Sequence, residues 1–334
     1  MSLRIEHQVG GFARRRWVAL CAALLSLTLS PSPAAAQTAD FGPRPVRIIN
    51  QFGPGGGADN IVRPLLDRLA ASIGVPFVIE HKPGAAGAIA AQEFENGRPD
   101  GHTLIIDTQT LLLNTALRKV AYRHDEWEPV ALLGIIPLAL LVRKELPARS
   151  LPELVEHARL NPGQITYATL GPGSAAHLAA LRFQSVTGIR MLAVPYKGTS
   201  EIHTDLLGKR IDVFFDGVSQ AVPRHRDRLL DILGFTTQAR LPIAAEIPTF
   251  QEQGVDLVLG AWFGISAPKG TPAGLLSRLA QAFGSALSAP DYRERMSGLG
   301  IVVAQEQLAD FGRFRRADLE RWQAIIESSK LKLD

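Results

Sequence analysis

The chain has 334 residues, is 46% hydrophobic and 20% charged, and contains a single cysteine, Cys21. Its formal charge of +4 comes mainly from the N-terminus: the first 36 residues hold four arginines and one glutamate, which leaves 32 basic and 31 acidic residues in the rest. A nearly neutral chain gives no basis for binding nucleic acid or an anionic membrane surface. Because Cys21 lies in that N-terminal stretch, the residues after 36 contain no cysteine. Disulfides, cysteine nucleophiles and thiolate metal sites are therefore excluded there.

Residues 1–36 have the pattern of a secretory signal peptide. Three arginines at 14–16 precede an apolar run at 17–30, and three alanines at 34–36 form a cleavage pattern before Gln37. The apolar run is too short to cross a bilayer, which takes about 20 residues. We therefore predict that residues 1–36 are removed on export. No later uncharged apolar run is long enough to span a membrane, so a soluble mature product is expected.

After residue 40 the sequence alternates between strand-like and helix-like segments. Candidate strands are residues 46–50, 76–80, 103–107, 164–170, 191–196, 211–216 and 229–235. Segments with helical spacing lie between most of them, for example 61–72, 151–160, 175–187 and 200–207. Apolar runs without alternation, separated by helices, indicate parallel strands buried on both faces, so we predict an α/β protein with helices on both sides of the sheets. Residues 272–329 are predicted to be mostly helical, with Arg313, Arg315 and Arg316 on a solvated face.

Two apolar stretches, 128–144 and 255–270, are too long for single parallel strands. We interpret them as segments that leave one domain and enter another. This divides the chain into a discontinuous first domain, 40–142 plus 262–334, and a second domain, 143–261. Two crossing segments are typical of a hinge-bending protein with its site in the crevice. The alternative is a single large sheet with long edge strands.

The glycine-rich loop QFGPGGGADN at 51–60 follows a strand and precedes a helix, an arrangement that can hold an anion at the helix N-terminus. A Walker P-loop is excluded, because no second glycine followed by lysine occurs. The dinucleotide fingerprint does fit residues 53–58, with Glu80 where a ribose-binding acid would lie. Export argues against a nicotinamide cofactor, and the loop can also hold any small anion that is not a nucleotide, a carboxylate included. Asp59 is expected mainly to cap the helix.

A second loop, YATLGPGSAAHL at 167–178, repeats this design. Ser174 is placed either as an N-cap or as a hydroxyl donor to a ligand, and His177 lies one turn further along. A Ser174–His177 catalytic pair is disfavoured, because the chain has no G-x-S-x-G elbow and a helical i, i+3 pair gives the histidine poor reach. If the hinge interpretation holds, each domain contributes one such loop to the crevice, which suits a small carboxylated ligand.

At this level of detail the sequence resembles the tripartite tricarboxylate transporter substrate-binding proteins, also called Bug receptors or the TctC family. The resemblance covers nearly all of residues 40–334. It is carried, in order, by RPVRIINQFGPGGGADNIVRPL, VIEHKPGAAGAIAA, RPDGHTLII, YATLGPGSAAHLAALRFQSVTG, VPYKGTSEIHTDLLGKRIDVFFD, IPTFQEQGVDL and WFGISAPKGTP.

The resemblance implies a two-domain, hinge-bending periplasmic binding protein of type II-like fold, whose loops hold ligand carboxylates with backbone N–H groups, hydroxyls and bridging waters. Carried over by position, the implied ligand-binding residues are Phe52, Gly56, Gly57, Ala58, Asp59, Thr108, Thr110, Gly171, Pro172, Gly173, Ser174, His177 and Asp216.

The chain departs from the family pattern in ways that remove polar groups. Family members often carry a hydroxyl residue at the positions of Ala58 and Ala175, a residue such as asparagine at Pro172, and a larger polar residue at Gly217. Because each missing hydrogen bond costs about 0.5–1.5 kcal/mol net, these departures favour a ligand less polar than a simple dicarboxylate, such as a monocarboxylate with an apolar body.

The sequence therefore predicts a periplasmic receptor for a small carboxylated compound, acting for a tripartite tricarboxylate-type transporter or a sensor protein. It is expected to be a monomer and to need no catalytic residue, no cofactor and no metal. The alternative from another class is an exported α/β enzyme, dinucleotide-binding or hydrolytic, that uses the same cleft.

Overall fold

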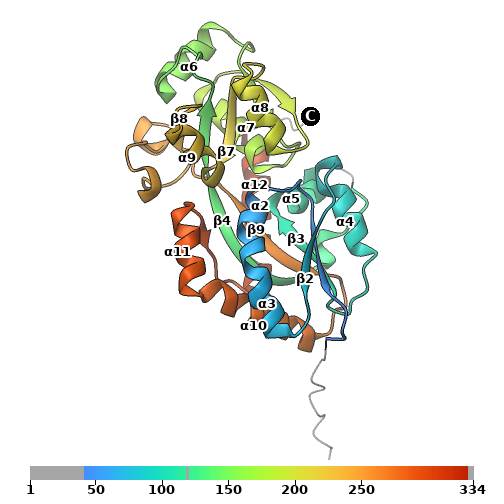
Figure 1. The fold of residues 1–334 in the computed structure, drawn as a ribbon. Coiled ribbons are helices and arrows are strands. Elements are labelled where there is room, and N and C mark those ends of the chain that lie inside the picture. The colour runs from blue at the N-terminus through green and yellow to red at the C-terminus, as the bar shows by residue number, and fades with distance from the viewer. Residues whose placement is uncertain (1–40, 118–119, 330–334) are drawn as a thin grey trace, which may run out of the picture. The chain divides into compact units, whose positions relative to one another are not determined.

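The computed structural model describes residues 41–117 and 120–329 of the chain (Figure 1). The predicted signal peptide lies outside the described residues. The strands are β1 (Val46–Asn50), β2 (Phe77–His81), β3 (Thr103–Thr108), β4 (Glu128–Val142), β5 (Thr166–Thr169), β6 (Leu192–Pro195), β7 (Val213–Gly217), β8 (Asp231–Phe235), β9 (Gly260–Ala267) and β10 (Val302–Val303). The seven predicted short strands are therefore confirmed, with ends that differ by at most a few residues.

The strands lie in the order β2-β1-β3-β9-β4-β7-β5-β6, with β8 and β10 also paired to β4. We call β1, β2, β3, β9, β10 and the first part of β4 the first sheet, and β5 to β8 with the last part of β4 the second sheet. Within the first sheet β1 pairs in parallel with β2 and β3, and within the second β5 pairs in parallel with β6 and β7. The strands β4, β8, β9 and β10 run antiparallel to their partners.

The long strand β4 joins the two sheets. Its first part pairs with β9 as far as Pro137, and from Leu138 onward it pairs with β7. Proline has no backbone N–H to give to a ladder, so it is suited to the point where the strand changes partners. The prediction that the stretch 128–144 passes between two parts of the fold is thus confirmed. The single-sheet alternative required this long strand to lie at an edge. Instead, β4 lies in the middle of the strand order, between β9 and β7.

The second long stretch behaves differently from the first. Only β9 is a strand there, and it pairs within the first sheet alone. The preceding residue Leu259 is held by Thr236, at the end of β8: the Leu259 N–H donates to the Thr236 carbonyl over 3.0 Å, and the Thr236 hydroxyl donates back over 2.6 Å. The Thr236 N–H also donates to the Leu138 carbonyl. Both segments that cross between the sheets therefore meet at one buried threonine.

Helices cover both faces of the first sheet, as predicted. Neighbouring residues of a strand point to opposite faces. Ile48 belongs to the core cluster of α3 (Leu66–Ile73) and α10 (Ala273–Ser288), whereas Ile49 belongs to that of α4 (Ala88–Glu95) and α5 (Gln109–Leu117). The helices are α2 (Gly57–Val62), α3 (Leu66–Ile73), α4 (Ala88–Glu95), α5 (Gln109–Leu117), α6 (Leu151–Leu160), α7 (Ala175–Thr187), α8 (Thr199–Leu207), α9 (Val218–Arg226), α10 (Ala273–Ser288), α11 (Pro290–Gly298) and α12 (Ala309–Ser329). Among the helices of the described residues, none combines the length and apolar character needed to cross a bilayer.

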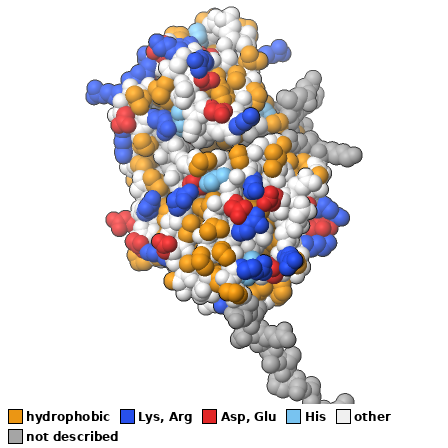
Figure 2. All heavy atoms as spheres, turned by 45° about the vertical axis from the view of Figure 1, so that its right-hand side comes forward, with side chains coloured by type: hydrophobic (Ala, Val, Ile, Leu, Met, Phe, Trp, Pro, Cys, Tyr) orange, Lys and Arg blue, Asp and Glu red, His pale blue; other side chains and the backbone are white. Residues whose placement is uncertain are grey.

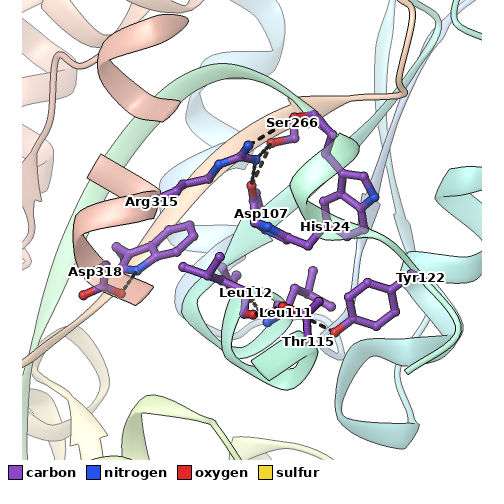
Figure 3. Close-up of polar contacts among 12 residues, drawn as sticks. Asp107, Leu111, Leu112, Thr115, Tyr122, His124, Ser266, Arg315 and Asp318 are labelled. Carbon is purple, nitrogen blue, oxygen red and sulfur yellow. Dashed lines mark hydrogen bonds and ion pairs between the residues drawn. The ribbon is translucent and has the colours of Figure 1, made fainter. Parts of the chain in front are cut away.

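The predicted exposure of Arg315 is wrong. Arg313 and Arg316 are exposed, but Arg315 is only 8% exposed and reaches from α12 to Asp107 at the end of β3 (Figure 3). Its guanidinium donates to Asp107 over 2.9 Å, to Ser266 over 3.2 Å and to the Trp127 carbonyl over 3.1 Å. A charged run on a helix predicts a solvated face only when no buried acid lies across from it, and Asp107 is such an acid.

Asp107 is the centre of this buried network. Besides Arg315 it accepts hydrogen bonds from His124 and Ser266, each over 2.7 Å. Complete burial by itself would raise the pKa of Asp107, but the nearby His124 and Arg315 hold that pKa well below its usual range. The network thereby fixes α12 to the first sheet through an ionised carboxylate.

On the face seen in Figure 2, acidic and basic side chains lie close together. Ion pairs of this kind join Arg47 to Glu80 over 2.7 Å and to Glu93 over 2.9 Å, and Lys82 to Glu93 over 3.2 Å, wherever on the surface they lie. Such mixing agrees with the nearly balanced charge of the chain after residue 36.

Candidate functional site

A cavity of about 450 Å³ lies between loops that belong to the two sheets. Its volume falls within the range of roughly 300–1,000 Å³ that is common for small-molecule sites. From the first sheet it receives the β1–α2 loop, the start of α5 and part of β9. From the second sheet it receives the start of α7, the start of α8 and the junction of β7 with α9. The strand β4, which belongs to both sheets, contributes Ile136 and Leu138 to its lining.

The first glycine-rich loop lies at this cavity. Phe52, Gly56, Gly57 and Ala58 line it, and Gly56 is the N-cap of α2 with no side chain bonded to the open helix end. Asp59 is not part of the lining and is 5% exposed. The first turn of α2 therefore faces the cavity with backbone N–H groups, which favours an anion there.

Asp59 instead stabilises the loop from behind. Its carboxylate accepts from the Gly55 N–H over 2.9 Å, from Asn50 Nδ2 over 3.2 Å and from Arg63 over 3.0 Å. The bond to Gly55 runs back to a residue before the helix, as in a capping box. This agrees with the structural role that the sequence favoured for Asp59.

The second loop reaches the cavity through Leu170 and through Ser174 with the start of α7. Ser174 lines the cavity and is the N-cap of α7, since its Oγ accepts from the His177 N–H over 3.3 Å. Gly171, Pro172 and Gly173 are not part of the lining. Gly171 and Gly173 have φ angles of 102° and 76°, in the region where glycine is favoured, so they form the turn that brings Ser174 into place.

His177 is buried behind Ser174 and is not part of the cavity wall. Its ring stacks on Tyr167 with the two centroids 6.4 Å apart, and burial lowers its pKa to about 4. The contact between Ser174 and His177 involves the histidine backbone N–H and not the ring. A nucleophile and its base must share a hydrogen bond between side chains, so this geometry does not form a Ser–His pair.

The remaining predicted residues lie where β3 and β7 end. Thr108, Thr110 and Asp216 all line the cavity. Asp216 is 2% exposed, and it accepts from His203 Nε2 over 2.7 Å and from the Gly217 N–H over 2.9 Å. His203 was missed from the sequence, because nothing in the pattern of α8 shows that one of its buried residues meets the end of β7.

The floor of the cavity is apolar. Ile136 of β4 is 2% exposed. Its side chain occupies the space beside two glycines, Gly57 at the start of α2 and Gly217 at the end of β7. A Cβ added at Gly57 would come within 2.8 Å of Ile136 Cδ1, and one added at Gly217 would come within 3.0 Å of Ile136 Cγ2. The small residues at these two positions therefore make room for an isoleucine, which the sequence could not reveal.

Two contacts join loops of the first sheet to loops of the second. The Gln220 amide of α9 donates to the Gly55 carbonyl over 3.1 Å. Ala86 approaches Gly171 closely, so that a Cβ added at Gly171 would lie 3.2 Å from the Ala86 Cβ. Ala86 has a φ of 48°, a strained value for a residue with a side chain, and Asn114 Nδ2 donates to its carbonyl over 2.9 Å. These contacts hold the two sides of the cavity together.

The helix α12 supports the cavity wall from outside. Its Asp318 accepts from Trp262 Nε1 over 2.8 Å and from Gln109 Nε2 over 3.3 Å, and both donors belong to cavity-lining residues (Figure 3 shows Asp318 beside the labelled network). Within residues 41–117 and 120–329 no group of three or more His, Asp, Glu or Cys side chains is arranged to hold a metal ion.

The fold and the cavity define a class of protein, the periplasmic solute-binding proteins, and solved structures of that class match this chain. The periplasmic binding protein BugD superposes with a TM-score of 0.82 at 27% identity, covering 87% of this chain and 99% of that one. MatC from Rhodopseudomonas palustris with bound malate gives 0.81 at 30% identity, covering 86% and 100%. The R. palustris protein Rpa4515 with adipate gives 0.83 at 29% identity, covering 87% and 99%.

Residues 61–331 match the family model described as the tripartite tricarboxylate transporter family receptor. This match covers most of the chain, so the chain belongs to that family. The resemblance stated from the sequence motifs is confirmed, and so is the two-domain binding-protein fold. The exact domain boundaries, 40–142 plus 262–334 and 143–261, stay a prediction.

Proposed function

We propose that this protein is an exported receptor that captures a small carboxylated compound in the cavity between its two sheets. The observation that carries the proposal is that two helix starts, those of α2 and α7, meet at one cavity. Backbone N–H groups at helix starts bind anions without any cationic side chain. In support, two structurally similar proteins have been solved with carboxylates, MatC with bound malate and Rpa4515 with adipate.

The same proposal assigns roles to the predicted residues that line the cavity. Gly56, Gly57 and Ala58 would offer backbone N–H groups on one side, and Ser174 a hydroxyl on the other. Thr108, Thr110 and Asp216 would contact the body of the ligand. Phe52 would cover it. Asp59, His177 and the turn at 171–173 would hold these groups in position.

We further propose that the ligand-bound, closed protein presents its surface to membrane permease subunits or to a sensor protein, as a monomer and without catalysing a reaction. The geometry of Ser174 and His177 supports a binding role, because the imidazole ring does not reach the hydroxyl. The enzyme alternative has no comparable support.

A thermal-shift panel tests the proposal. The purified protein is heated with small carboxylates, with the primary amides of the same acids, and with NAD. A ligand that binds only the native state adds about 2.7 kcal/mol at a concentration a hundred times its dissociation constant. We expect a shift with at least one carboxylate and none with its amide. A shift with NAD alone would contradict the proposal and support the dinucleotide fingerprint.

A further inference from the structure

We propose that the ligand is a monocarboxylate with an apolar, aromatic body, and that dicarboxylates are disfavoured. The inference rests on the proposed function, because it specifies the ligand of the same cavity. Two features of the cavity carry it: the charges in its wall and the apolar surface that Ile136 and Leu138 contribute.

The wall has little to offer a second carboxylate. Among the described residues that line the cavity, the charged side chains are Lys197, Glu201 and Asp216, so the acids outnumber the base. Lys197 and Glu201 are exposed and screened by solvent, whereas Asp216 is buried. Asp216 is therefore the one charged lining side chain that is shielded from water, and His203, which pairs with it over 2.7 Å, lies outside the lining.

Asp216 is fixed in place and can only accept hydrogen bonds. Its two oxygens take bonds from His203 and from the Gly217 N–H, so the side chain cannot turn away from the cavity without breaking both. A ligand carboxylate beside it would place two like charges in a region of low dielectric, which strengthens their repulsion. A ligand with one carboxylate at the helix starts and a neutral far end avoids this cost.

The apolar surface lies where the body of such a ligand would rest. Ile136 fills the space beside Gly57 and Gly217, and Leu138 continues the floor along β4. Phe52 and Phe263 also line the cavity, with their rings edge to face and 6.2 Å between centroids. An aromatic body placed against these side chains buries apolar area, which a hydrated carboxylate cannot do.

Titration calorimetry on the purified protein tests the inference with four ligands: 3-phenylpropionate, its amide 3-phenylpropionamide, adipate and malate. We expect 3-phenylpropionate to bind at least tenfold more tightly than either dicarboxylate, and the amide not to bind measurably. Equal or tighter binding of adipate or malate would overturn the inference and leave the carboxylate receptor intact. Binding of the amide as tight as that of the acid, or no binding of any acid, would count against both proposals.

Variants connect the preference to named residues. Asp216→Asn removes the buried charge, and we expect it to reduce the ratio between 3-phenylpropionate and adipate affinity at least threefold. The matched control Asp227→Asn, at an exposed position in the segment after α9, should leave that ratio unchanged. Phe52→Ala should weaken 3-phenylpropionate but leave propionate affinity within twofold. The inference is wrong if both cavity variants melt like the parent protein, Asp216→Asn leaves the ratio of 3-phenylpropionate to adipate affinity unchanged, and Phe52→Ala leaves 3-phenylpropionate affinity unchanged.

Discussion

Replacing Arg315 by methionine should destabilise the protein strongly, because it breaks a buried ion pair from one side. The guanidinium makes three hydrogen bonds, and its partner Asp107 is completely buried. Removing one member of a buried pair costs about 3–5 kcal/mol, since the other charge is left uncompensated. His124 and Ser266 still donate to Asp107, so we expect the lower end of that range, about 3 kcal/mol.

The chain offers a matched control in the next residue. Arg316 is exposed on the same helix, and Arg316→Met should change stability by less than about 0.5 kcal/mol. At about 2–4 °C for each kcal/mol in a protein of this size, Arg315→Met should lower the melting temperature by about 6–12 °C. The assay is thermal unfolding followed by circular dichroism, with denaturant titration to obtain the free energy of unfolding. Equal, small shifts in both variants would refute the role given to Arg315.

Three further expectations follow from the site. In the unfolded chain His177 has its ordinary pKa near 6.5, whereas burial lowers its pKa to about 4 in the folded protein. The free energy of unfolding should therefore fall as pH decreases from about 6.5 to about 4. In His177→Phe, the melting temperature should fall less between pH 7 and pH 5 than it does in the parent protein. Ser174→Ala removes the N-cap of α7 and should lower the free energy of unfolding by about 1 kcal/mol, which corresponds to a melting temperature lower by about 2–4 °C. If the parent protein had an esterase activity that this variant lacked, the binding role would be contradicted. Gln220→Ala removes a hydrogen bond between the two sides of the cavity that is worth about 0.5–1.5 kcal/mol. Calorimetry should therefore show affinity reduced about 2- to 13-fold for every ligand alike, and a loss confined to one ligand would argue against a closing contact.

The parts of this fold that could be predicted from the sequence are those fixed by neighbouring residues. The apolar run at β1 and the Ser174 cap with Gly188 at the far end of α7 place their elements to within a residue or two, because strand and helix signals are local. The passage of β4 between the two sheets could also be predicted, since an uninterrupted run of that length exceeds one ordinary strand.

Contacts between distant residues could not be predicted in this way. Arg315 finds Asp107 at a separation of 208 residues, and no local pattern distinguishes it from the exposed Arg316. Ile136 lies in a run of similar apolar residues, and only the fold shows that it is the one between Gly57 and Gly217. The glycine loops indicated where an anion could be held, but the side chains that surround it depend on these long-range contacts.

The most direct test of the proposed binding mode is a crystal structure of the protein with the carboxylate that gives the largest thermal shift. We expect a carboxylate oxygen to lie within about 3 Å of a backbone nitrogen in the first turn of α2 or of the Ser174 hydroxyl, with the rest of the ligand against Ile136 and Phe52. A ligand bound outside this cavity, or a carboxylate turned toward Asp216 and away from both helix starts, would contradict it.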